Sequence, residues 1–135
     1  MTQGRSPKSV LRDNRGFTLI ELLATMSIIG ILSAIASHEF VAYTQRAYDA
    51  RAAGDIRDAA TAEEAYYSEN ESYLDCAGTT CDSLLPGFLA SIGVQVEITS
   101  RDAQQAFDAM AQHPAGEKVF HYSNDVGSIS WVPRS

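Results

Sequence analysis

A chain of 135 residues suffices for one domain of ordinary size and excludes a large two-domain enzyme. Hydrophobic residues make up 45% and charged residues 20% of the chain, near the average of globular proteins, which excludes a disordered or collagen-like chain. The net charge of −7 opposes binding to a phosphate backbone, so we expect no nucleic-acid partner.

Residues 1–16 form a short basic leader. Four basic side chains stand against one acid, Asp13, which gives the segment a net charge of +3. The positive-inside rule keeps such a segment in the cytoplasm and predicts that the chain beyond the following apolar run is exported. The basic side chains are Arg5, Lys8, Arg12 and Arg15.

An apolar run follows directly. Of the 20 positions from residue 17 to residue 36, 14 are apolar and Glu21 carries the only charge. A helix of this length extends about 30 Å and can cross a bilayer once. A carboxylate within such a span is unfavourable without a partner, whereas one near the helix start can reach the hydrated interface. Glu21 is therefore either a paired functional residue or an interfacial one.

The string RGFTLIELLATMSIIGILSAIA resembles the N-terminal signature of type IV pilins and pseudopilins, and the resemblance covers residues 12–43. A basic leader, Gly, Phe, Thr, Leu, Ile, Glu and an uninterrupted apolar run occur in it in fixed order. The resemblance implies that a prepilin peptidase cuts between Gly16 and Phe17 and that the new Phe17 amine is methylated. It also implies that the inner-membrane pilus assembly machinery draws the chain into a helical filament of identical subunits, a homo-oligomer.

The same resemblance gives Glu21 a role. In the filament the apolar helices pack without lipid, where an unpaired buried carboxylate is strongly unfavourable. The family pairs this carboxylate with the α-ammonium group of Phe17 on a neighbouring subunit. We therefore expect Phe17 and Glu21 to be the assembly residues, and Gly16 and Phe17 to be the processing residues.

A second interpretation of the N-terminal segment remains open. Ala34, Ile35 and Ala36 form the A-x-A pattern that an ordinary signal peptidase cuts, which would release a soluble exported protein starting at Ser37. The apolar region would then be longer than usual and would contain Glu21, which argues against this interpretation.

The helical pattern continues beyond the apolar run. Many type IV pilins have Pro at the place of His38, and this chain lacks that helix breaker. Residues 43–68 contain no Pro and place apolar side chains at spacings of three and four, so we expect one helix from Phe17 to Ser68. We expect an α+β fold in which this long helix packs on a small antiparallel sheet head, the pilin fold. The expected parts are the cleaved leader 1–16, the transmembrane and filament-core helix 17–43 and the exported head 44–135.

Residues 69–85 are rich in turn-forming residues and are predicted to connect the helix to the sheet as a loop. The loop holds both cysteines, Cys76 and Cys81. In an exported domain an even, close pair is predicted to form a disulfide. The alternative is half of a metal site, for which His113 and His121 are the available further ligands.

Three segments after the loop show strand patterns. Val94, Val96 and Ile98 alternate with polar residues. Residues 118–123 and 128–132 are two further candidates, which a four-residue turn joins as a hairpin.

Residues 101–113 fit either a helix or a strand by composition. By analogy with pilin heads, we expect a turn or short helix up to Gln105 and then a strand over residues 106–113. The expected core of the head draws on large apolar side chains from the helix, the loop and the strands. These are Ile56, Tyr66, Leu84, Leu85, Phe88, Leu89, Val94, Val96, Phe107, Phe120 and Trp131.

The exported part shows no nucleotide-binding loop, zinc signature, nucleophile elbow or paired catalytic carboxylates, so we expect neither an enzyme nor a cofactor. Asp75 with Asp82, or Asn124 with Asp125, could bind Ca²⁺ loosely. The dense Gly and Asp pattern of the calcium loop of major pseudopilins is missing, and we expect no metal.

These patterns predict a structural subunit of a type IV pilus or a related filament. It would enter the inner membrane by one span, with its head in the periplasm, and would end in a cell-surface pilus. The alternatives are a pseudopilin of a type II secretion system and, from a different class, a membrane-anchored or secreted binding module. A disulfide without a calcium loop favours the pilus subunit, and a binding module has no use for Glu21.

Overall fold

The fold is taken from a computed structural model, which describes residues 16–134 of the chain. The basic residues of the predicted leader lie outside this range. The chain divides into two compact units, Met1–Ser37 and His38–Ser135, and each is described by itself. One helix, α1 (Leu19–Asn70, 52 residues), contributes to both units.

The predicted long helix is confirmed, with slightly different bounds. α1 begins at Leu19 rather than Phe17 and ends at Asn70 rather than Ser68. It passes through His38 without interruption. Since no Pro removes a backbone N–H there, every residue of this stretch can continue the helix.

Three hydroxyl side chains in the apolar part of α1 form hydrogen bonds to the backbone of the same helix. Thr25, Ser27 and Ser37 each donate to a backbone carbonyl three or four residues earlier, which is the usual behaviour of Ser and Thr inside a helix. The apolar part therefore needs no polar partner for these groups. The hydrogen bonds join Thr25 to Leu22 (2.9 Å), Ser27 to Leu23 (2.8 Å) and Ser37 to Ala34 (3.1 Å).

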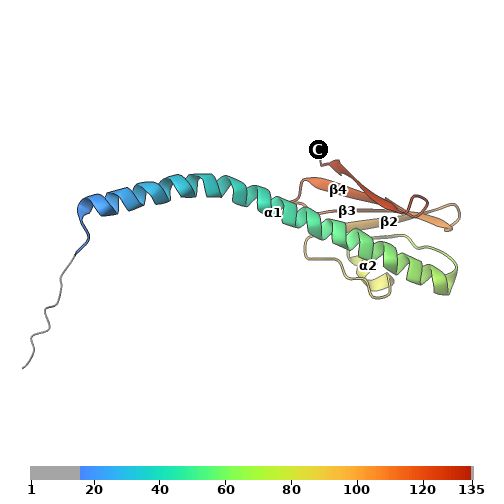
Figure 1. Cartoon of the computed structure of the whole chain (residues 1–135). Helices are drawn as coiled ribbons and strands as arrows, with labels where there is room; N and C mark the ends of the chain where they lie inside the picture. The colour runs from blue at the N-terminus through green and yellow to red at the C-terminus, as the bar shows by residue number, and fades with distance from the viewer. Residues whose placement is uncertain (1–15, 135) are drawn as a thin grey trace, which may run out of the picture. The chain divides into compact units, whose positions relative to one another are not determined.

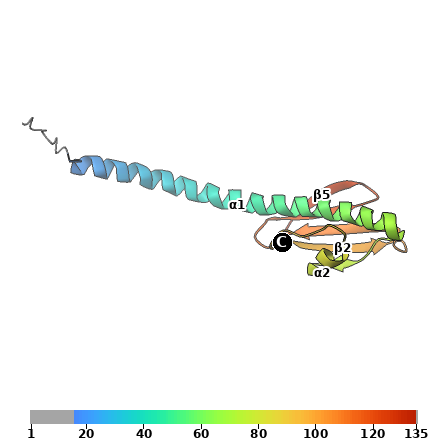
Figure 2. The same cartoon turned by 90° about the horizontal axis from the view of Figure 1, so that it is seen from below.

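The head is built on one antiparallel sheet of five strands in the order β1-β2-β3-β4-β5, so that β1 and β5 are its edges. Figures 1 and 2 show this sheet against the part of α1 that belongs to the head. The three predicted strand segments are confirmed, and the last two pair as the expected hairpin. The strands are β1 (Cys76–Ala77), β2 (Gln95–Arg101), β3 (Ala106–Gln112), β4 (Lys118–Ser123) and β5 (Ser128–Pro133).

The segment between α1 and β2 is more regular than the predicted loop. The expectation for residues 69–85 is wrong because α1 extends to Asn70, two residues form β1, and a short helix, α2 (Thr79–Leu84), follows. The N–H of Gly78 donates to the carbonyl of Val96 at 2.8 Å, which holds the start of α2 against β2. Turn-forming composition does not reveal such pairing with a distant strand, and that pairing orders the segment.

The ambiguous segment 101–113 contains a turn followed by a strand, as predicted. Asp102, Ala103 and Gln104 have φ angles of 51°, 56° and 67°, a left-handed conformation that excludes a right-handed helix there. β3 begins at Ala106, as expected, and ends at Gln112, one residue earlier than expected.

The core of the head lies between α1 and the inner face of the sheet. Val96 is in register with Ala111, Ala111 with Phe120, and Phe120 with Trp131, so these four side chains share that face. Most of the predicted core is confirmed. The predicted core residues that are buried are Ile56, Leu85, Phe88, Val94, Val96, Phe107 and Phe120, and Tyr66 is partly buried.

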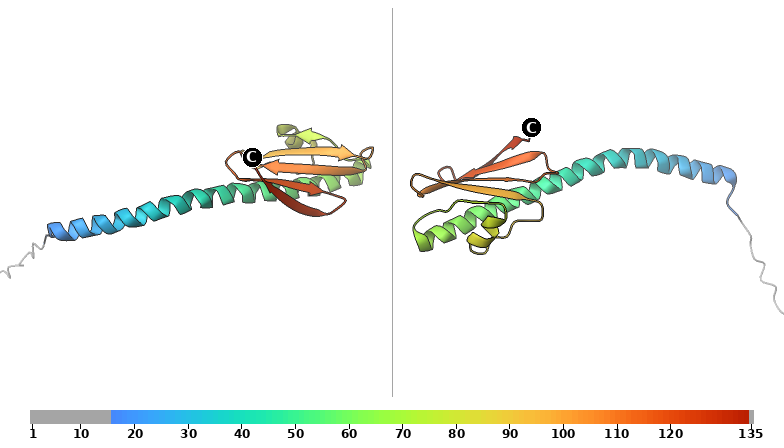
Figure 3. Two further views of the ribbon diagram at one scale, coloured as in Figure 1. Left: turned by 90° about the horizontal axis from the view of Figure 1, so that it is seen from above. Right: turned by 180° about the vertical axis from the view of Figure 1, so that it is seen from behind.

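Three predicted core residues are wrong: Leu84, Leu89 and Trp131 are 51%, 78% and 53% exposed. Trp131 is in register with the buried Phe120 and so belongs to the helix side of the sheet, but it lies on the edge strand β5. In Figure 3, β5 (red) and α2 (yellow-green) lie at opposite edges of the sheet. Small side chains take their place in the core, since Ala52 and Ala59 of α1 are fully buried. A core of alanines brings the helix close to the sheet, and a ranking by side-chain size misses it.

Candidate assembly site

The predicted processing residues lie just ahead of α1. Gly16, Phe17 and Thr18 have no regular secondary structure, and Phe17 is 84% exposed. The peptide bond between Gly16 and Phe17 thus lies outside α1.

Glu21 completes a hydrogen-bonded ring at the start of α1. Its Oε2 atom accepts from the backbone N–H of Thr18 at 2.8 Å and from the Thr18 hydroxyl at 2.7 Å. The N–H of Glu21 lies 3.3 Å from the same hydroxyl oxygen. Thr followed three residues later by Glu is the capping box that starts many helices. The T-x-x-E spacing is visible in the sequence, but the interpretation of Glu21 as an isolated charge missed it.

The apolar part of α1 is uncovered in the single chain. Its large apolar side chains between residues 19 and 35 are 51% to 80% exposed. By length and composition α1 can cross a membrane, and none of its most apolar window is buried inside the protein. The core helix of a soluble protein would be buried, although a signal sequence would give the same pattern. Such an exposed apolar surface is typical of a segment that lipid or other apolar helices surround.

Cys76 and Cys81 form the predicted disulfide, with their Cα atoms 5.0 Å apart. The bond joins β1 to α2, and Cys81 is fully buried in the core of the head. The alternative of a metal half-site is wrong because both thiols are used in the disulfide. Asp75 and Asp82, the acids on either side, each accept a hydrogen bond from a backbone N–H and thereby fix the local chain.

Two buried carboxylates on α1 tie the helix to distant parts of the head. Asp49 Oδ1 accepts from the N–H groups of Glu117 at 2.9 Å and Lys118 at 3.1 Å. Asp55 accepts from the N–H of Ser91 at 2.7 Å and from its hydroxyl at 2.9 Å. Sequence reasoning missed both acids. Their position within the alanine-rich buried face of the helix was the available signal, because a charge on such a face needs partners.

Glu63 is a third carboxylate on the same face and is fully buried. Its Oε2 atom accepts from the N–H of Leu74 at 3.3 Å, while Oε1 has no hydrogen-bond partner among the residues that the structure describes. The pKa of Glu63 is raised to about 7, chiefly by burial; the hydrogen bond from Leu74 lowers it, and the nearby charges of Asp75 and Glu64 add to the rise.

The two histidines considered as metal ligands, His113 and His121, do not lie beside the cysteines but contact other parts of the head. His113 is buried, its ring stacks on that of Tyr48 with centroids 4.1 Å apart, and its Nδ1 accepts from the N–H of Ala115 at 3.0 Å. His121 lies on β4, paired with Met110 of β3. Within residues 16–134 no group of three or more His, Cys, Asp or Glu side chains could hold a metal ion.

Known proteins similar to this chain are pilus proteins. The sequence model described as "Prokaryotic N-terminal methylation motif" matches residues 11–37. Over 117 residues the chain is 40% identical to the type IV wide pilus major component PilA4 of Thermus thermophilus, and the match covers 87% of each chain.

Two shorter matches concern a type IV major pilin protein and a fimbrial protein. The chain is 42% identical over 64 residues to the type IV major pilin protein PilA of Myxococcus xanthus, which covers 47% of this chain and 29% of the relative. It is 37% identical over 67 residues to a fimbrial protein of Pseudomonas aeruginosa, which covers 50% of this chain and 44% of the relative. The matched part of the chain thus spans less than half the length of these two relatives.

Proposed function

This chain belongs to the type IV pilin family, and we propose that it is a structural subunit of a type IV pilus. The observation that carries the proposal is the first part of α1, which is apolar, uncovered and interrupted by the single charge of Glu21. The similar proteins are pilus components or fimbrial proteins by name, which favours a pilus subunit over a secretion pseudopilin, a binding module or an enzyme.

Maturation comes first in the proposed mechanism. A prepilin peptidase cuts between Gly16 and Phe17, and the new amine is methylated, in keeping with the methylation motif over residues 11–37. Because the cut precedes the apolar run, α1 stays on the mature chain. The subunit then waits in the inner membrane with its head in the periplasm, and the assembly machinery draws it into a filament of identical subunits that ends at the cell surface.

Phe17 and Glu21 set the register of the proposed filament. In the single chain Glu21 is bonded to Thr18 at the helix start, where interfacial water can also reach it. Assembly removes that water and surrounds the carboxylate with apolar helices. The α-ammonium group of Phe17 on a neighbouring subunit, which methylation leaves charged, is the cation presented at the same depth. Such a buried pair contributes mainly specificity, because desolvation offsets much of its attraction.

Replacing Glu21 by Gln tests this function. Glu21→Gln keeps the side-chain shape but removes the charge, so the subunit should still insert and mature, and filaments should be few or absent by electron microscopy. Glu39→Gln, the same change farther along the exposed side of α1, is the matched control and should assemble normally. Filaments of normal number and length in Glu21→Gln cells would rule out the pairing.

Intact-mass analysis of the membrane fraction tests maturation. Wild-type protein should begin at Phe17 and carry one added methyl group, whereas Gly16→Val should retain the leader because a side chain does not fit a peptidase site that accepts Gly. Wild-type protein beginning at Ser37 would contradict the filament function.

A further inference from the structure

Residues 71–75 join the end of α1 to β1, and we call this segment the connector. It lies against Glu63 of α1, whose side chain is fully buried. The N–H of Leu74 in the connector donates to Glu63 Oε2 at 3.3 Å, whereas the buried Oε1 has no hydrogen-bond partner among residues 16–134. A buried acid with one unpartnered oxygen is unfavourable, and it is most unfavourable when it carries a charge.

The ionisable groups around Glu63 are acids and phenols. Glu64 follows it on α1 and Asp75 ends the connector, and both negative charges oppose ionisation of Glu63. The hydroxyl of Tyr73 in the connector donates to the two carboxylate oxygens of Glu64, at 3.0 and 3.1 Å. The Tyr73 ring stacks on that of Tyr67 of α1, with the ring centres 4.4 Å apart. A charge on Glu63 would therefore have two like charges as neighbours.

The sheet supplies no compensating cation within the described residues. Arg101, at the end of β2, is paired with Asp108 and Asp125, and these are the salt bridges recorded among residues 16–134. β3 contributes the ring of Phe107, whose centre lies 4.7 Å from that of Tyr73. Glu63 thus has no basic side chain within 4 Å in this part of the chain.

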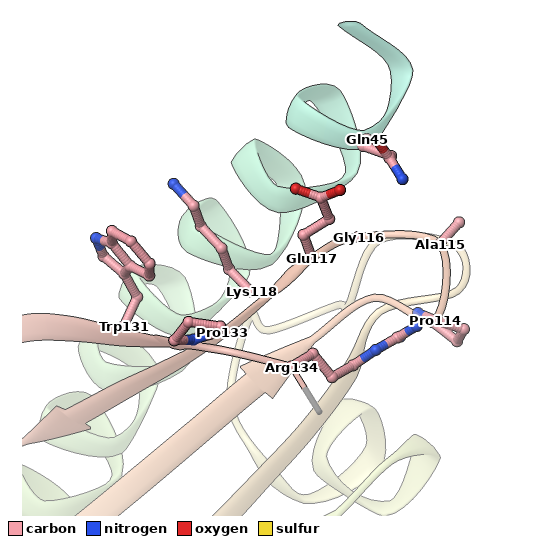
Figure 4. Close-up of a pocket in the computed structure, with 9 residues that line it drawn as sticks. All are labelled: Gln45, Pro114, Ala115, Gly116, Glu117, Lys118, Trp131, Pro133 and Arg134. Carbon is pink, nitrogen blue, oxygen red and sulfur yellow. The ribbon is translucent and has the colours of Figure 1, made fainter. Parts of the chain in front are cut away.

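Water has no open route to Glu63. A hollow of about 600 Å³ opens beside Gln45 and Trp131 (Figure 4), but Gln45 precedes Glu63 by 18 residues, or about 27 Å along the helix. Glu63 lines neither this hollow nor any of the four smaller hollows found within residues 16–134. Solvent can therefore hydrate the carboxylate only when a covering segment moves, and the connector is the covering segment without regular structure.

The connector is also bonded to a strained turn. The N–H of Tyr73 donates to the carbonyl of Gln104 at 2.9 Å. The side chain of Gln105 donates to the carbonyl of Glu71 at 3.1 Å. Residues 102–104 of this β2–β3 turn all have left-handed φ angles, a conformation that is unfavourable for residues other than Gly and is often found in segments that switch. The connector and the β2–β3 turn are therefore coupled and can open together.

We propose that the connector and the β2–β3 turn form a proton-controlled latch, which is closed over protonated Glu63 and opens when Glu63 loses its proton to solvent. The neutral acid accepts from Leu74 and carries no charge that needs hydration. The carboxylate faces two negative charges with one oxygen unpartnered, so it gains most from the entry of water. The ladders of β2 with β3 and of β3 with β4 have their own hydrogen bonds, so the latch can open while the sheet stays folded. The latch adds a pH response to the proposed subunit and does not depend on filament assembly.

The direction and size of the response follow from proton linkage. The pKa of Glu63 is about 7 in the closed latch, chiefly because of burial, whereas the ordinary value of 4.5 applies when water reaches the group. Between these values the open form releases a proton that the closed form keeps, so the ratio of open to closed molecules rises with pH. Below pH 4.5 and above pH 7 the ratio is constant. The interval of 2.5 pH units between the two values corresponds to a rise of at most about 300-fold.

Hydrogen exchange of the full-length chain in detergent, followed at single amides by NMR from pH 4.5 to pH 8, tests the latch. After correction for the intrinsic pH dependence of exchange, protection of the Tyr73, Leu74 and Gln105 amides should fall by up to about 300-fold as far as pH 7 and then stay level. Glu63→Gln keeps an oxygen for the N–H of Leu74 but cannot ionise, so its protection should not depend on pH. Glu64→Gln is the matched control, because Glu63 can still ionise in it and most of the fall should remain.

Low concentrations of urea separate opening of the latch from unfolding of the head. Local opening exposes little surface, so exchange of the latch amides should respond weakly to urea, whereas exchange of the β4 amides should accelerate strongly. Latch amides that respond to urea as strongly as β4 would overturn the proposal, because they would exchange only when the whole head unfolds. Protection that does not change with pH in the wild type, or that falls equally in Glu63→Gln, would overturn it as well. None of these measurements requires filaments, so failure of the latch and failure of the proposed function are distinguishable.

Discussion

Asp49 on α1 accepts a hydrogen bond from the backbone N–H of Glu117, which lies 68 residues later in the chain, at 2.9 Å. The same Oδ1 atom accepts from Lys118 at 3.1 Å, so one carboxylate fixes the entry of β4 against the helix. Gly116 precedes this point, and a Cβ atom there would collide with the Asp49 carboxylate. This contact holds the start of β4 close to α1.

Removing this carboxylate should destabilise the head. Asp49→Ala leaves two backbone N–H groups without their acceptor, and we expect the free energy of unfolding to fall by about 3 kcal/mol. Urea unfolding of the detergent-solubilised chain, followed by the fluorescence of Trp131, measures the change. Asp58→Ala, at an exposed position of the same helix, should stay within about 0.5 kcal/mol of wild type. Equal effects in both variants would contradict the anchoring role.

Replacing Gly93 and Gly54 by alanine should change the free energy of unfolding in opposite directions. Gly93 has a φ of 86°, and an added Cβ atom would lie 2.5 Å from Nε2 of His113, so Gly93→Ala should lower the free energy of unfolding by about 1 to 3 kcal/mol. Gly54 lies inside α1 with open space around it, so Gly54→Ala should raise it by about 1 kcal/mol. Thermal unfolding of both variants measures these changes. A Gly93→Ala protein that is more stable than wild type would show that the His113 ring moves freely away from the added Cβ atom.

The Cys76–Cys81 disulfide should contribute modestly to stability. It closes a ring of few residues, for which loop-closure entropy predicts about 2 kcal/mol. The Cys76→Ala/Cys81→Ala double variant should lose about this amount in urea unfolding and should not respond to a reducing agent. When the disulfide of the wild-type protein is reduced, its free energy of unfolding should fall toward that of the double variant. A reduced wild-type protein of unchanged stability would contradict the prediction.

The sequence was most informative where a pattern is long and local. The apolar run and the alternation at Val94, Val96 and Ile98 determine the long helix and β2, because helix and strand periodicities appear directly in neighbouring residues. The short β1 and α2 escaped prediction, since their order depends on bonds to residues far away, such as that of Gly78 to Val96. Local composition carries no record of such contacts.

Burial was predicted less well than secondary structure. Trp131 was expected inside because of its size, yet its place on the edge strand leaves it half exposed. Asp49 and Asp55 were not recognised as buried, because their burial depends on backbone N–H groups that come from other parts of the chain. For Glu21 the capping partner Thr18 was visible three residues away, whereas its proposed pairing with Phe17 involves a second chain and rests on the family resemblance.

Glu63 should make the stability of the head depend on pH. Burial raises its pKa in the folded state to about 7, whereas the unfolded chain has the ordinary value of 4.5. Between these values the unfolded chain releases a proton that the folded chain retains, so the contribution of Glu63 to the free energy of unfolding decreases as the pH rises. The slope is at most about 1.4 kcal/mol per pH unit, and it vanishes below pH 4.5 and above pH 7.

Comparison of wild type with Glu63→Gln isolates this effect from all other titrating groups. Gln keeps an oxygen acceptor for the N–H of Leu74 but cannot ionise beside Asp75 and Glu64, so the variant should lack the loss between pH 4.5 and pH 7. Near pH 4.5 the two proteins should have similar stability, and at pH 8 the variant should be the more stable one. Urea unfolding at a series of pH values measures the difference. A difference that stays constant from pH 4.5 to pH 8 would show that Glu63 titrates normally in the folded head, with water or a rearranged loop reaching its carboxylate.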